Sequence, residues 1–156
     1  MELEILMVVA EISVALAGFS AIVANFSSNW TEADSRQLST LLTQSGIALF
    51  AAMVPLVMSQ SDEDIGNTWM VSSFCYIFCA SIAVAVEIYR GWSQSGGSSR
   101  IDQIFGASFF IAIMAQAYNL YIGAQGWIYL LALLLNIAYA FVSFTMIIRP
   151  RVIAKE

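Results

Sequence analysis

The sequence contains no histidine, a single lysine and two cysteines among its 156 residues. Haem and metal sites that depend on histidine, and histidine general bases, are therefore excluded. Because the lysine, Lys155, is the penultimate residue, a retinal Schiff base inside a membrane is excluded too. Cys75 and Cys79 are too few to build a four-ligand metal site within one chain. We expect neither a metal ion nor a cofactor.

Charge is also scarce. Charged residues make up 11% of the chain and hydrophobic residues 60%, whereas soluble domains typically have about 25% and 45–50%. A soluble domain of this length has a large surface for its volume and could not cover it with so few charges. The composition excludes a disordered chain, a nucleic-acid-binding module and a secreted domain held by disulfides. It predicts one integral membrane domain, residues 1–156, in contact with the lipid bilayer and with no nucleic acid.

Five apolar stretches stand out, each long enough to cross a hydrocarbon core of about 30 Å at about 1.5 Å per helical residue. They cover about residues 5–26, 38–58, 68–89, 101–122 and 127–148. Thr31, with Asp34 three residues later, is typical of a residue that caps the start of a helix. Pro55 lies late in the second stretch, where it should kink the helix because proline has no backbone N–H. The sequence predicts an all-α fold, a polytopic transmembrane bundle of five helices.

The basic residues indicate the orientation of the bundle. Five spans would place all of them on one side of the membrane, namely Arg36, Arg90, Arg100, Arg149, Arg151 and Lys155. Because Lys and Arg are enriched in cytoplasmic segments, we expect the N-terminus outside and the C-terminus in the cytoplasm. The tryptophans fall near span ends and are expected to anchor the bundle at the membrane interfaces. These anchors are Trp69 and Trp127 at the outer interface, and Trp30 and Trp92 at the inner one.

Glu11 is the one acidic residue predicted to lie within the membrane, about 10 Å below its outer boundary at 1.5 Å per residue. An ionised carboxylate there costs several kcal/mol unless it is hydrated or paired. No lysine or arginine of the predicted spans could pair with it. Glu11 is therefore expected to be protonated, hydrogen-bonded to neutral groups or in contact with water. It serves either an ion path or the structural attachment of one helix to another.

Small residues lie beside Glu11 on the first predicted helix. Ala17, Gly18 and Ala21 would let another helix approach closely. We expect this side of the helix to face protein or water and to support assembly of several copies. The bulky positions of the same helix should then lie elsewhere; they are Leu6, Val9, Leu16 and Phe19.

Polar side chains also occur inside the other predicted spans. Gln116, Asn119, Asn136 and Tyr76 fall at about the depth of Glu11 and could form a cluster with it. Each amide alone is explained by an interhelical hydrogen bond worth about 1 kcal/mol, whereas together they could mark a hydrated interior. Two polar residues of the second span, Thr40 and Gln44, are expected to lie deeper in the membrane. The resulting candidates for an ion path are Glu11, Thr40, Gln44, Gln116 and Asn136.

Three consecutive acids, Asp62, Glu63 and Asp64, occupy the predicted outer loop between the second and third spans. Their charge could concentrate cations at the mouth of a pore. The alternative is a solvated loop whose negative charge helps to set the topology. The outer surface carries no basic residue in this topology, which favours cations over anions.

The first helix, AEISVALAGFSAIVANF, followed by a polar turn and Arg36, resembles the opening helix of small multi-pass bacterial membrane proteins of no assigned activity. The resemblance implies a bacterial inner membrane. The sequence has no nucleophile–base pair and no glycine-rich phosphate loop, so we do not expect an enzyme. We expect an oligomeric ion channel or transporter that favours cations. The alternatives are a non-enzymatic accessory subunit of a larger membrane complex, or a binder of lipid or another hydrophobic ligand.

Overall fold

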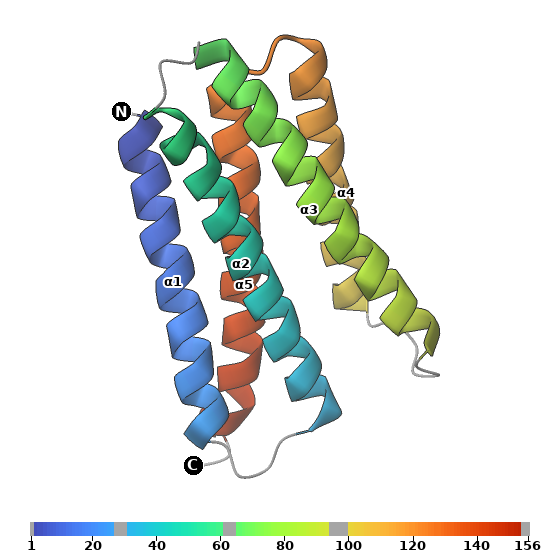
Figure 1. The fold of residues 1–156 in the computed structure, drawn as a ribbon. Coiled ribbons are helices and arrows are strands. Elements are labelled where there is room, and N and C mark those ends of the chain that lie inside the picture. Colours follow the sequence, from blue (N-terminus) through green and yellow to red (C-terminus); the bar gives the residue numbers. More distant parts are fainter. Residues whose placement is uncertain (1, 27–30, 61–64, 94–99, 154–156) are drawn as a thin grey trace.

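The computed structural model describes the backbone of residues 2–26, 31–60, 65–93 and 100–153. Side chains are described in the same ranges apart from positions 2, 26, 32, 33, 65, 66, 90–93, 100–108 and 149–153. In these ranges the chain forms five helices: α1 (Glu2–Phe26), α2 (Glu32–Met58), α3 (Ile65–Ser93), α4 (Arg100–Tyr121) and α5 (Gly126–Ile153). Successive helices run in opposite directions, and the two termini lie at opposite ends of the bundle (Figure 1). The predicted all-α fold is confirmed.

Four of the helices are long and apolar enough to cross a membrane by length and composition. Their apolar segments are Leu3–Asn25, Asp34–Met58, Asn67–Tyr89 and Gly126–Ile148. In α4 the apolar segment among the described residues is shorter, Phe109–Tyr121. The four long helices suggest an integral membrane protein that passes through the bilayer several times.

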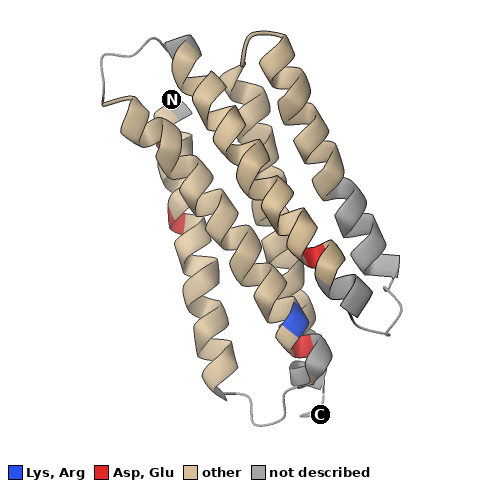
Figure 2. Cartoon of the chain, turned by 45° about the vertical axis from the view of Figure 1, so that its right-hand side comes forward, with Lys and Arg blue, Asp and Glu red and all other residues tan. Residues whose placement is uncertain are grey.

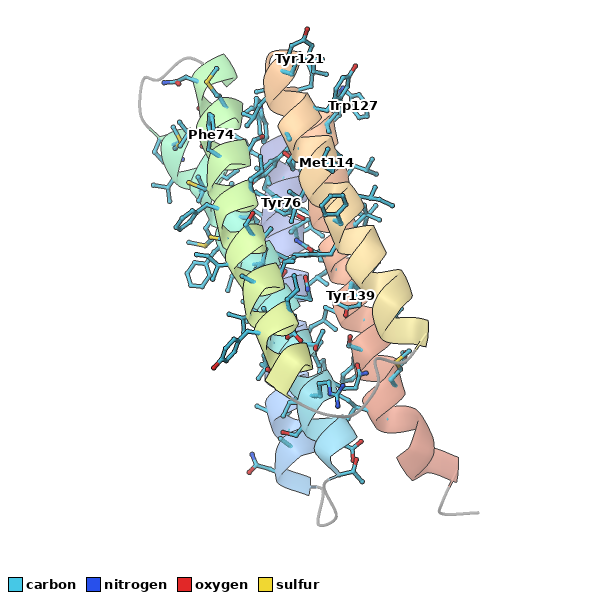
Figure 3. The ribbon with its side chains drawn as sticks, turned by 90° about the vertical axis from the view of Figure 1, so that its right-hand side faces the viewer. Phe74, Tyr76, Met114, Tyr121, Trp127 and Tyr139 are labelled. Atoms are coloured by element: carbon cyan, nitrogen blue, oxygen red, sulfur yellow. The ribbon has the colours of Figure 1, made fainter. Side chains whose placement is uncertain are left out.

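The outer surface of the bundle fits this assignment. Large apolar side chains such as Phe50, Phe78 and Ile111 point away from the bundle and are mostly exposed. Phe74 of α3 and Met114 of α4 likewise project outward (Figure 3). Charged positions interrupt the described part of the ribbon at only a few places (Figure 2). A continuous apolar surface of this kind is unusual for a soluble monomer and natural for helices in contact with lipid.

The helices pack as a group of three and an attached pair. Helix α1 contacts α2 and α5, and α2 also contacts α5 and α3. Helix α4 lies between α3 and α5, and α1 contacts neither α3 nor α4 within the described residues. Small buried residues on α2, namely Ala48, Ala51 and Ala52, allow the close approach of its neighbours.

Two apolar clusters hold the bundle. The larger joins Leu6 of α1, Trp69 and Tyr76 of α3, and Tyr129 and Leu133 of α5, together with Ala51 and Ala52 of α2. The ring of Tyr129 lies 5.7 Å from that of Trp69 and 6.2 Å from that of Tyr76, between centroids. The smaller cluster lies towards the other end and joins α1, α2 and α5 through Leu16, Leu41, Ala140 and Ile147. Among the described side chains, α3 and α4 join the bundle through the larger cluster, which also includes Phe109 of α4.

The start of α2 confirms the predicted cap. The hydroxyl oxygen of Thr31 accepts a hydrogen bond of 3.2 Å from the backbone N–H of Asp34. The carboxylate of Asp34 in turn accepts a hydrogen bond of 3.1 Å from the backbone N–H of Thr31. This reciprocal pair satisfies two N–H groups that a helix start leaves without partners.

Two of the four tryptophans expected at the membrane interfaces have described side chains. Trp69 is only 6% exposed and packs on Tyr129, so its ring belongs to the core of the bundle, while its place at the outer interface stays a prediction. Trp127 is 63% exposed and points outward beside the turn between α4 and α5 (Figure 3). The side chains of Trp30 and Trp92 lie outside the described part of the chain.

Candidate functional site

Within the protomer, helix α1 buries bulky residues rather than the small residues beside Glu11. Its inner stripe consists of bulky residues and two serines: Leu6, Val9, Ser13, Leu16 and Ser20. Glu11 is exposed, because it lies two residues before Ser13 and thus about 200° away around the helix. The expectation that the leucines and Val9 would lie away from the helix contacts was therefore wrong. Serines are tolerated in the inner stripe because each hydroxyl bonds to its own helix, Ser13 to Val9 O at 2.7 Å and Ser20 to Ala17 O at 2.6 Å.

The small residues near Glu11 do not pack within the protomer. Ala17 is half-buried, whereas Gly18 and Ala21 are exposed. A Cβ atom added at Gly18 would meet no heavy atom within 4 Å. Around them, apolar side chains such as Val14 and Ile22 also point outward. Glu11 therefore lies on an open face of a helix of membrane length. We call Glu11, Gly18 and Ala21, with the exposed residues between them, the outward face of α1.

Of the predicted polar cluster, Asn136 and Tyr76 bond to each other, whereas Gln116 and Asn119 bond to other groups and Glu11 is exposed. Asn136 of α5 and Tyr76 of α3 are each 1% exposed. The Asn136 side-chain N–H donates to the Tyr76 hydroxyl oxygen at 3.2 Å. Tyr76 points from α3 into the bundle (Figure 3). This contact joins α3 to α5 within one protomer, in the manner expected of an interhelical hydrogen bond.

Gln116 and Asn119 connect α4 to its neighbours. The Gln116 side-chain N–H donates to the backbone carbonyl of Ile128 in α5 at 3.1 Å. The Asn119 side chain accepts from Gln125 N–H at 2.7 Å and donates to Gln125 O at 3.2 Å. The same amide nitrogen lies 3.4 Å from the hydroxyl oxygen of Ser73 in α3. Asn119 therefore fixes the segment that leads into α5, and it also attaches α4 to α3.

Backbone hydrogen bonds also fix the turn between α4 and α5. Ala124 N–H donates to Asn119 O at 2.8 Å, and Gly123 N–H donates to Leu120 O at 3.4 Å. This pair of bonds is a common way to end a helix, with a left-handed residue just after the last turn. Gly123 occupies that position with φ of 96°, which glycine adopts at little cost.

The sequence analysis missed a contact made by Tyr129. Proline has no N–H, so Pro55 cannot bond to Ala51 O, the carbonyl four residues earlier in α2. The Tyr129 hydroxyl of α5 donates to that carbonyl at 2.6 Å. Helix α2 continues through Pro55 to Met58. The signal was present in the sequence, because a proline inside a helix implies a free carbonyl four residues before it.

Four buried polar atoms have no hydrogen-bond partner among the described residues. They are Gln44 Oε1, Ser45 Oγ, Gln116 Oε1 and Asn136 Oδ1. A buried polar group without a partner costs about 1–3 kcal/mol. Contacts within the described bundle therefore satisfy only some of the hydrogen-bonding groups in its interior.

The remaining candidate residues are Thr40 and the acids at positions 62–64. Thr40 is half-buried on α2, and the acids at positions 62–64 lie outside the described residues. Cys75 and Cys79 are exposed on α3. Within the described residues, no three cysteine, aspartate or glutamate side chains gather in a way that could hold a metal ion.

Comparisons of the chain with protein-family models, with curated proteins and with solved structures found no match. Two features of the structure bear on the function. One is the polar interior, and the other is the outward face of α1.

Proposed function

We propose that the protein is an oligomeric membrane protein that conducts cations, with copies meeting at the outward face of α1 and Glu11 lining or lying near the path between them. The observation that carries this proposal is the outward position of Glu11. Its neighbours Val8, Ile12 and Val14 are exposed and apolar. A carboxylate in such a setting costs several kcal/mol in lipid, and contact with a second copy or with water removes that cost.

The exposed small residues support the same arrangement. Gly18 and Ala21 leave room on the helix surface, and small residues let the backbones of two membrane helices approach closely. A protomer of this size leaves little interior for a full permeation route of its own. A path between copies places Glu11 next to the permeating ion without any rearrangement of the protomer.

The proposal includes the orientation derived from the sequence. Helix α2 begins, and helices α3 and α5 end, at one end of the bundle (Figure 1). With α4 as a fifth span, every basic residue belongs to segments at that end, which we assign to the cytoplasm. The end of α2 and the start of α3, which flank the acids in the sequence, then lie at the outer end. The assignment to a bacterial inner membrane rests on the resemblance of the first helix.

Cation flux into liposomes tests the proposal. The purified chain is compared with Glu11→Gln, which keeps the size of the side chain and removes its charge. We expect Glu11→Gln to reduce potassium flux about tenfold, corresponding to about 1.4 kcal/mol on ion entry. Glu87→Gln, which removes a carboxylate from an exposed position on α3, is the matched control and should leave the flux within about twofold. An equal effect of the two variants would contradict a path at Glu11.

The second candidate is an accessory subunit of a larger membrane complex. Asn119, Asn136 and Tyr129 are used to fix helices to one another, which favours a rigid scaffold whose open α1 face receives a helix of another protein. A lipid or another hydrophobic ligand is a further candidate for the same face. Unmodified protein that conducts no ion in liposomes would reject the channel and leave these alternatives.

A further inference from the structure

Three of the four unpaired atoms of the described interior share one chemical property. Gln44 Oε1, Gln116 Oε1 and Asn136 Oδ1 are amide oxygens, which can only accept hydrogen bonds. Their residues are 7%, 0% and 1% exposed. What each of them lacks is therefore a hydrogen-bond donor, and no side chain of the described interior supplies it.

The contact between Tyr76 and Asn136 leaves one donor and one acceptor unused. Tyr76 accepts from the Asn136 amide, so its own hydroxyl hydrogen still requires an acceptor. Asn136 Oδ1 requires a donor. Rotating the amide by 180° would let its oxygen accept from Tyr76, but its nitrogen would then lose its partner. In either orientation a third group is needed to complete the hydrogen bonds.

The orientation of Gln116 is fixed by its partner. The carbonyl of Ile128 can only accept, so the group that faces it must be the amide nitrogen of Gln116. Gln116 Oε1 consequently remains without a donor in any assignment of the amide.

Gln44 lies at about the same level as Asn136. The hydrogen bond from Tyr129 to Ala51 joins α5 to α2. Gln44 lies seven residues from Ala51, and Asn136 lies seven residues from Tyr129, on helices that run in opposite directions. At about 1.5 Å per residue, both amides are roughly 10 Å from this joint in the same direction. Ser45, whose hydroxyl also lacks a partner, shares this level.

We propose that the bundle holds ordered water at two levels, one at Asn136 and Tyr76 with Gln44 and Ser45, and one at Gln116. A water molecule accepts from the Tyr76 hydroxyl and donates to Asn136 Oδ1, which completes both groups. Another donates to Gln116 Oε1. Buried water typically makes two to four such bonds to groups that are otherwise unsatisfied. Water suits these sites because it supplies the donors that the amide oxygens lack and also accepts from a hydroxyl. This inference does not rest on cation conduction.

Magnetic resonance of the side-chain amides tests the proposal on the full chain in lipid nanodiscs. With 15N-labelled asparagine and glutamine, we expect cross-peaks between water and the side-chain N–H groups of Asn136 and Gln116. Asn119 is the internal control, because it is equally buried and both of its amide atoms are paired. It should show no such cross-peak. Cross-peaks no stronger at Asn136 and Gln116 than at Asn119 would overturn the proposal.

The variant Tyr76→Phe tests the water proposed at Asn136 separately from the water proposed at Gln116. Loss of the hydroxyl removes one attachment of the water at Asn136, so its cross-peak should weaken at least twofold while that of Gln116 persists. Unchanged cross-peaks at both residues would mean that Tyr76 does not hold water. If the variant does not fold, the comparison with Asn119 in the unmodified chain decides. Displacement of the water signals on adding sodium or potassium would identify an ion site and also overturn the proposal.

Discussion

Asn119 and Glu11 are both polar residues in apolar helices, but their surroundings differ. Asn119 is fully buried, and each atom of its amide group has a partner on α3 or at the start of α5. Glu11 lies on the outside of α1 and has no hydrogen bond or ion pair among the described residues. Contacts within the protomer explain why Asn119 stands in an apolar helix. None of the described contacts explains why Glu11 does. A costly residue that the protomer does not need points to a role between molecules.

The largest effect is expected inside the bundle, at Asn119. Asn119→Ala removes the bonds that fix the turn and leaves Gln125 N–H without its partner. At about 1 kcal/mol for each bond, the free energy of unfolding should fall by about 3 kcal/mol. Reversible unfolding in mixed micelles of dodecyl sulfate measures this change.

Asn25→Ala is the control for that experiment. Asn25 is exposed, and among the described residues its side chain bonds to Ala21 O on its own helix, at 3.1 Å. Its replacement should change the free energy of unfolding by less than about 0.5 kcal/mol. Equal losses for the two variants would mean that burial and attachment between helices do not distinguish the polar residues of this chain.

A smaller effect is expected at Tyr129. Tyr129→Phe leaves Ala51 O buried without a donor and should lower the free energy of unfolding by about 2 kcal/mol. In the background Pro55→Ala, the N–H restored at position 55 can bond to Ala51 O. In that background, Tyr129→Phe should lower the free energy of unfolding by about 0.5 kcal/mol or less. A double-mutant cycle measures the difference, and strictly additive losses would show that Tyr129 does not act through the carbonyl freed by Pro55.

The positions of the helices could be predicted from the sequence, because each apolar stretch ends at polar or turn-forming residues. Thr31 with Asp34 marked the start of α2, and residues 123–126 marked the turn before α5. The closeness of Tyr76 and Asn136 was predicted from their similar depth in α3 and α5, which run in the same direction.

The inner face of α1 could not be predicted. In a soluble protein the buried face is the apolar one, but lipid is as apolar as the interior of a bundle. Leu6 is buried and Met7 is exposed, although both are apolar. The burial of Trp69 was missed for the same reason, since its place near a span end does not say whether the ring faces lipid or a neighbouring helix.

The smallest effect on the protomer is expected at Gly18. A Cβ atom added there meets no heavy atom within 4 Å, the position is exposed, and leucine favours the helix over glycine by about 0.8 kcal/mol. Gly18→Leu should therefore leave the free energy of unfolding of the protomer unchanged or raise it by up to about 1 kcal/mol. A leucine on the outward face of α1 would nevertheless hold two copies apart, so light scattering in mild detergent should show a smaller particle. Gly46→Leu, on α2 and with equally open space at its Cβ, is the matched control and should leave the particle unchanged. If both variants assemble like the unmodified chain, the outward face of α1 meets lipid, and the contact between copies must be sought on another helix.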